Sequence, residues 1–182
     1  PTAQEGFHLA VPMLVPYEEL NERLAKKVVG EEIIPPVGSS IQITGVRVYG
    51  SGNNLISEVT VTGGVNGKLY LQGKPTLASD GHTLELRDFN FTMDTSNMLA
   101  RFTNRTLHDT ILEKILPNTR IDVEDRIAGL RSRVQRQMNR ELAPGIWLEG
   151  AVTKLDPRGI YPVAGGVEMQ FVMDGTLNLT IQ

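Results

Sequence analysis

Three histidines are the side chains of this sequence best suited to binding a metal ion or transferring a proton. His8, His82 and His108 lie far apart, although His82 comes two residues after Asp80 and His108 directly precedes Asp109. Neither spacing puts two ligands on one helix face or one strand face, which is the arrangement that a metal site needs. The sequence therefore predicts no metal site.

Enzyme signatures are also missing from the sequence. It contains no G-x-S-x-G elbow, no Walker A loop, no dinucleotide-binding glycine motif after a strand and no H-E-x-x-H pair. Gly50-Ser51-Gly52 begins like a phosphate loop, but no helical pattern follows, so it predicts a hairpin turn. Asp122, Glu124 and Asp125 favour the first turn of a helix over a calcium loop. A Ser–His–Asp triad needs no proximity in sequence, and nothing here favours one. We expect no catalytic residue, no cofactor and no enzymatic activity.

Four arginines form one polar stripe on a predicted helix that begins at Asp122. On that stripe they would touch lipid phosphates or an acidic partner, or they would form the solvated side of an amphipathic helix, which is the interpretation that the pattern favours. The candidate membrane or partner contacts are Arg126, Arg133, Arg136 and Arg140.

Apolar residues, including six methionines, recur on several predicted elements. Flexible methionine side chains suit a lining that accepts ligands of variable shape, although the same residues would also fill an ordinary core. For any one of them packing is the favoured role. The residues that we select as candidate ligand-lining positions are Phe89, Phe91, Met93, Leu107, Ile111, Met138, Met169 and Phe171.

The composition restricts the class of protein. The chain has 182 residues, a formal charge of −3, 40% hydrophobic residues and no cysteine. This size allows one domain with a real core, and the charge balance excludes a nucleic-acid binder dominated by basic charge. Without cysteine there are no disulfides, thiolate metal sites or cysteine nucleophiles. No apolar run reaches the roughly 20 residues that a membrane-spanning helix needs.

The N-terminal half of the sequence reads mainly as strands. Residues 7–15 alternate in polarity, with prolines on the opposite parity, which predicts an edge strand. Apolar spacing over residues 17–28 predicts a short helix that ends at Gly30. Residues 39–94 then alternate between strands and turns. Their parity flips at Gly45 and near Asp88, which predicts two bulges in a strongly curved antiparallel meander.

The remaining residues predict two helices and a second block of strands. An apolar helix begins after residues 94–96, and Pro117 interrupts it. A second, amphipathic helix runs from Asp122 to residue 142, with an apolar stripe of Ile127, Leu130, Val134, Met138 and Leu142. Strands are expected at residues 146–152, 160–163, 167–173 and 176–181, with a turn at Asp174-Gly175. Separate blocks of strands and helices indicate an α+β protein with an antiparallel sheet.

Five segments together resemble a bacterial envelope family that is designated domain of unknown function 4403. They are residues 67–75 (GKLYLQGKP), 84–91 (LELRDFNF), 94–99 (DTSNML), 142–150 (LAPGIWLEG) and 174–177 (DGTL). These are strand and turn patterns rather than catalytic signatures, and the resemblance covers most of the chain.

The family is similar to the TULIP (tubular lipid-binding) superfamily, which includes bactericidal permeability-increasing protein and SMP domains. The resemblance implies a strongly curved antiparallel sheet wrapped around one long helix, with a tube for acyl chains. Pro117 departs from that pattern because it kinks or breaks the helix, and we expect a tube that is short or partly filled. The resemblance also implies a single domain over residues 1–182, as the C-terminal part of a longer chain, in a periplasmic or outer-membrane-associated location.

Two hypotheses for function follow. The first is non-enzymatic binding or transfer of lipid, or of another elongated hydrophobic ligand, in the bacterial cell envelope, with peripheral membrane contact. The second is a solid-cored interaction module of an envelope complex, which would use the arginine face or an exposed strand edge. The sequence predicts no nucleic-acid partner and indicates no oligomeric state. A hydrolase acting on envelope lipid is a distant third.

Overall fold

The computed structural model describes residues 3–35, 38–93 and 105–181. It divides into two compact units, each built from segments that are distant in sequence. Unit 1 comprises residues 1–14, 122–160 and 168–182, and unit 2 comprises residues 15–121 and 161–167. The prediction of a single domain over residues 1–182 stays a prediction.

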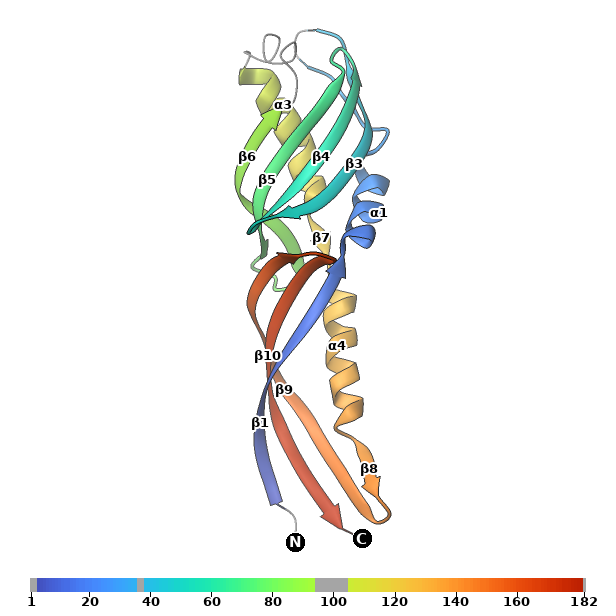
Figure 1. Cartoon of the computed structure of the whole chain (residues 1–182), viewed down its shortest axis with the longest axis vertical. Coiled ribbons are helices and arrows are strands. Elements are labelled where there is room, and N and C mark those ends of the chain that lie inside the picture. The colour runs from blue at the N-terminus through green and yellow to red at the C-terminus, as the bar shows by residue number, and fades with distance from the viewer. Residues whose placement is uncertain (1–2, 36–37, 94–104, 182) are drawn as a thin grey trace. The chain divides into compact units, whose positions relative to one another are not determined.

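Unit 2 contains most of a six-stranded sheet with the order β2-β3-β4-β5-β6-β7 (Figure 1). Its pairings from β2 to β6 are antiparallel, so the predicted meander is confirmed. The strands are β2 (Glu32–Ile33), β3 (Ile41–Ser51), β4 (Asn54–Gly63), β5 (Gly67–Leu77), β6 (Thr83–Met93) and β7 (Ile121–Asp122). Ser51 pairs with Asn54 and Gly52 has φ 58°, which confirms a two-residue hairpin turn in place of a phosphate loop.

Both predicted bulges are present in this sheet. The register of β3 against β4 shifts between Ile43 and Gly45, and that of β5 against β6 shifts between Gln72 and Lys74. On β6 the extra residue lies next to Asp88, which has φ 55°, the one positive φ of a non-glycine residue in the described chain. A bulge reverses which face the following residues point to, which is the parity flip that the sequence shows.

Two helices accompany the sheet of unit 2. Helix α1 (Tyr17–Val28) lies beside β3 (Figure 1) and buries Leu20, Leu24 and Val28, as its spacing predicts. Helix α3 (Arg105–Ile115) continues into the 3-10 helix η1 (Leu116–Thr119). Ile115 joins a cluster of buried residues drawn mainly from β3, β4 and β5. The hydrophobic core of unit 2 therefore lies between the sheet and its helices.

Unit 1 contains most of a four-stranded sheet with the order β1-β10-β9-β8 and one helix. The elements are β1 (Ala3–Pro16), α4 (Glu124–Gln137), β8 (Arg140–Ala143), β9 (Ile146–Val163) and β10 (Gly166–Ile181). Strand β1 is at the edge of the sheet, as its prolines predict. Met169, Phe171 and Met173 alternate along β10 and are all buried.

Helix α4 and Asn139, two residues after its end, close part of the edge of β9 with polar side chains spaced four residues apart. The Gln135 amide donates to Gly150 O, and its Oε1 accepts from Val152 N at 2.9 Å. Asn139 Nδ2 donates to Gly150 O at 2.8 Å, and Arg131 Nη2 donates to Val152 O at 3.1 Å. A Cβ on Gly150 would lie 2.8 Å from Met138 Cβ, so the glycine permits this close approach.

Three predictions about unit 1 are wrong. Helix α4 ends at Gln137, and Arg140 and Leu142 belong to β8, where both are exposed. Strands β9 and β10 run without the breaks expected at residues 153–159 and at Asp174-Gly175.

Local packing explains why β9 and β10 continue without a break. A Cβ on Gly175 would collide with the Phe7 ring, so this glycine makes room for an aromatic side chain inside a strand rather than forming a turn. Strand β8 pairs with β9 only between Ile146 and Leu148. Pro157 of β9 lies beyond these pairs, so its missing N–H removes no hydrogen bond to β8.

The described residues do not form one long helix inside a wrapped sheet. Helices α3 and α4 are separated by η1 and by the short strand β7, with Pro117 in the first turn of η1. The break predicted at Pro117 is therefore confirmed. The helix start expected at residues 94–96 lies outside the described residues.

Candidate ligand pocket in unit 2

A solvent-open pocket of about 300 Å³ lies between strand β6 and the 3-10 helix η1 of unit 2. Leu86 and Phe89 come from β6, and Leu116 and Pro117 come from η1. The other lining residues are Glu85, Thr119 and Arg120. The pocket thus has an apolar lining with one acidic and one basic side chain.

The bulge in β6 places Phe89 in the pocket. Leu86, before the bulge, is buried at 8% exposure, whereas Phe89, after it, is 41% exposed. On the partner strand, a Cβ on Gly73 would lie 3.1 Å from Leu86 Cβ and 3.6 Å from the Phe89 ring. The absent side chain of Gly73 therefore leaves room for the ring next to the bulge.

Hydrogen bonds fix the opposite wall of the pocket. Thr119 Oγ1 donates to Leu116 O at 2.8 Å, and Asn118 Nδ2 donates to Lys114 O at 2.9 Å. These bonds satisfy carbonyls at a helix end that have no partner within the helix. Pro117 restricts the backbone of the same turn. The wall is therefore held by local bonds and not only by packing.

Charged groups gather at Glu85. Its Oε2 lies 3.3 Å from Arg120 Nη2, and its Oε1 lies 3.5 Å from Arg87 Nε. Lys27 Nζ donates to Arg120 O at 2.8 Å. Both guanidinium contacts are longer than the 2.7–2.9 Å typical of a tight charge-assisted bond, so the two ion pairs are loose.

A much smaller cavity lies next to the pocket. This second cavity shares Glu85, Leu86 and Thr119 with the pocket but measures only about 20 Å³, which is room for one water molecule. Its walls come from α1, β3, β4, β6 and β7, and include Leu20, Val48 and the buried Ser57. This second cavity is therefore too small for an organic ligand.

The structure brings one of the predicted lining residues, Phe89, to the pocket. Phe91 packs against the core cluster of unit 2. Met138, Met169 and Phe171 are buried in unit 1. The side chains of Met93, Leu107 and Ile111 lie outside the described ones. The lining role of these residues stays a prediction, and for the four that are packed the structure shows a core position.

The predicted arginine stripe is divided between two elements. Arg126, Arg133 and Arg136 are on α4, and Arg140 is on β8. Arg126 Nη1 donates to Leu14 O at 3.2 Å and is only half-exposed, while Arg133, Arg136 and Arg140 are exposed. Their role in membrane or partner contact stays a prediction.

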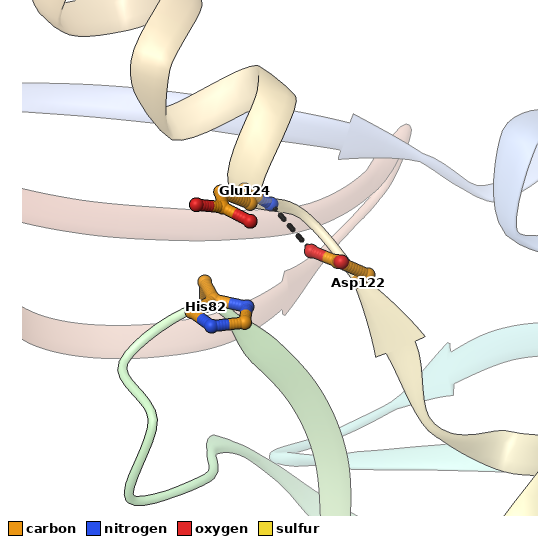
Figure 2. A group of neighbouring side chains, drawn as sticks. All are labelled: His82, Asp122 and Glu124. Carbon is orange, nitrogen blue, oxygen red and sulfur yellow. Dashed lines mark hydrogen bonds between the residues drawn. The ribbon is translucent and has the colours of Figure 1, made fainter.

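The carboxylate groups near the start of α4 have a structural role. Asp122 Oδ1 accepts from Glu124 N at 2.8 Å, as Figure 2 shows, which gives the first N–H group of the helix an acceptor. This is the helix-start role that the sequence predicts for these residues. His82, also drawn in Figure 2, belongs to unit 2.

Asp80 supports the turn between β5 and β6. Its carboxylate accepts from the Thr83 hydroxyl at 2.7 Å and from the backbone N–H groups of His82 and Thr83. The Thr83 hydroxyl first, and then these two N–H groups, lower the pKa of Asp80 from 3.8 to about 2. These bonds are local to the turn and indicate a structural acid.

Sequence reasoning missed most of the pocket. Glu85, Leu86, Leu116 and Arg120 carry no recognisable motif, and Pro117 was recognised only as a helix break. A usable signal is the parity flip near Asp88, because alternation from Leu84 and Leu86 would point Phe89 to the opposite face and the bulge turns it to the face of Leu86.

A family model described as "Domain of unknown function (DUF4403)" matches residues 1–181. No curated protein and no solved structure matches the chain. Among the described residues, no helix combines the length and the apolar character needed to cross a bilayer.

Proposed function

We propose, for a chain that belongs to the DUF4403 family, that the pocket of unit 2 binds a lipid or another ligand with an elongated apolar part, without chemical conversion. The observation that carries the proposal is the 300 Å³ pocket with Phe89 exposed at its wall. A large aromatic ring that stays in contact with water gains free energy when an apolar ligand covers it.

The size of the pocket limits the ligand. A volume of about 300 Å³ is at the lower end of the range for small-molecule sites. Each methylene group that leaves water contributes about 0.8 kcal/mol, so two additional carbons tighten binding about tenfold until the pocket is full. We therefore propose that the pocket covers one segment of an acyl chain rather than an entire lipid.

We extend the proposal to the context that the resemblance implies. The extended proposal includes a TULIP-like sheet around a helix, a role in lipid transfer, peripheral contact with a membrane, and a periplasmic or outer-membrane-associated location. An open pocket supports transfer better than a sealed one, because the ligand enters and leaves without unfolding of the core.

The test uses 1-alkanols of increasing length, which have an apolar chain and no charge. Isothermal titration of the whole chain should show tighter binding with each added pair of carbons, followed by a plateau. Phe89→Ser should weaken binding by about tenfold or more, whereas Tyr161→Ser, which removes an aromatic residue of similar exposure (47%) outside the pocket, should not. Affinity that is independent of chain length, or equal loss in both variants, would overturn the proposal.

The second candidate function, a solid-cored interaction module, rests on a different observation. Unit 1 has a packed interior and several exposed large hydrophobic residues, and a protein partner that covered them would remove apolar surface from water. They are Leu9, Leu14, Leu142, Trp147, Leu179 and Ile181. Native mass spectrometry of the protein purified without detergent separates the candidates, because adducts of fatty-acid or phospholipid mass support ligand binding and a bare mass supports the module.

A further inference from the structure

Two guanidinium groups contact a single carboxylate beside the pocket, and an ammonium group binds the backbone of one of these two arginines. Arg120 and Arg87 both contact Glu85, and Lys27 Nζ binds the Arg120 carbonyl. Three cations and one anion give this group a charge of 3 − 1 = +2. The neighbouring Lys74–Asp88 pair is neutral as a whole, at 3.4 Å, and leaves that sum unchanged.

Glu85 cannot satisfy both guanidinium groups. Each arginine carries five N–H donors. The single Glu85 carboxylate lies 3.3 Å from Arg120 Nη2 and 3.5 Å from Arg87 Nε. The Arg120 side chain is 51% exposed and lines the pocket, so its remaining donors are accessible where a ligand would end. An anionic group of planar, forked geometry suits such donors best.

We propose that the pocket selects an amphiphile with a carboxylate head, that is, a free fatty acid, whose head group binds Arg120 while its chain covers Phe89. This inference rests on the proposed function and names the ligand class for the same pocket. Arg120 acts by charge and hydrogen bonding at the rim, and Glu85 competes with the ligand for it.

The experiment compares decanoate with 1-decanol, which have equal chain length and differ at the head group. At low ionic strength decanoate should bind about three- to fivefold more tightly, and added salt should reduce that preference. Arg120→Gln should abolish the preference, so that the variant binds decanoate no more tightly than 1-decanol. Glu85→Gln should increase it, because the competing carboxylate is removed. Arg23→Gln, which removes another arginine paired with a glutamate on α1, is the matched control and should change neither affinity.

The outcomes separate the two proposals. If 1-decanol binds and decanoate binds no more tightly, or if Arg120→Gln keeps the preference, the head-group assignment is wrong and the apolar pocket stands. If neither compound binds, the proposed function itself fails. The opposite signs expected for Arg120→Gln and Glu85→Gln exclude a general loss of folding as the explanation.

Discussion

The two units close an exposed strand edge in the same way, but in unit 2 an open pocket lies beside the core. In unit 2, Asn21 of α1 accepts from Val48 N at 2.5 Å and donates to Val48 O at 3.5 Å. In unit 1, Gln135 of α4 makes the equivalent pair of bonds to Val152 N and Gly150 O. A side-chain amide carries the same donor and acceptor as a peptide group, so in each unit a helix takes the place of a neighbouring strand.

The strands of the two units differ in how completely their large apolar side chains are covered. The inward residues of β10 in unit 1 are at most 2% exposed from Met169 to Met173, whereas β6 of unit 2 leaves Phe89 at 41%. The difference arises from the β6 bulge and from Gly73 opposite it. Both units therefore close a strand edge, and the pocket of unit 2 lies where β6 bulges opposite Gly73.

The largest expected effect tests the contrast in packing. Phe171→Ala should destabilise unit 1 by about 3–5 kcal/mol because it leaves a cavity in a filled interior, while Phe89→Ala should cost less than about 1 kcal/mol. Urea unfolding followed by fluorescence of Trp147, the single tryptophan, reports on unit 1, and hydrogen exchange reports on unit 2. Equal costs for the two variants would mean that Phe89 is as tightly packed as Phe171.

The next effect tests the edge closure in unit 1. Gln135→Ala leaves the N–H of the buried Val152 without an acceptor and should cost about 1–3 kcal/mol. Gln137→Ala, an exposed glutamine in the same helix, is the control and should stay within about 0.5 kcal/mol. The measurement is urea unfolding with hydrogen exchange at Val152, and a Gln135 variant indistinguishable from the control would contradict the closure.

The corresponding change in unit 2 should have a smaller effect. Asn21→Ala should cost about 1–2 kcal/mol, because the longer of its two bonds, at 3.5 Å, contributes little. Hydrogen exchange should become faster at Val48 and stay unchanged at Val152. Glu22→Ala, on the next position of α1, serves as the control. Unchanged exchange at Val48 would show that this edge does not depend on the amide.

The smallest effect depends on pH and belongs to unit 2. Because the pKa of Asp80 falls from 3.8 to about 2 in the folded chain, its contribution to stability is complete above pH 4 and is lost as the pH falls to about 2. Thr83→Ala should move the NMR titration midpoint of the Asp80 carboxyl group towards 3.8. Thr76→Ala, on the paired strand β5, is the control. An unshifted midpoint would exclude the hydroxyl as the main cause.

Local patterns in the sequence predict much of the fold. Helix α1 and both bulges lie where spacing and parity put them, because these features depend on residues within one element or one hairpin. The errors lie where a residue has a distant partner. Gly175 resembles a turn residue until Phe7 is seen to pack against it, and Leu142 continues a helical stripe although it belongs to a strand.

By itself the sequence determined the α+β class, the family, the helix break at Pro117 and the lack of known catalytic motifs. Only the tertiary structure decided which apolar residues fill a core and which line a pocket, because burial depends on what lies opposite a side chain. Phe89 and Phe171 are the same residue type on strands of similar pattern. The residues that surround Phe171 and Phe89 include some that are distant in sequence, so the spacing within one strand does not predict which of the two side chains is covered.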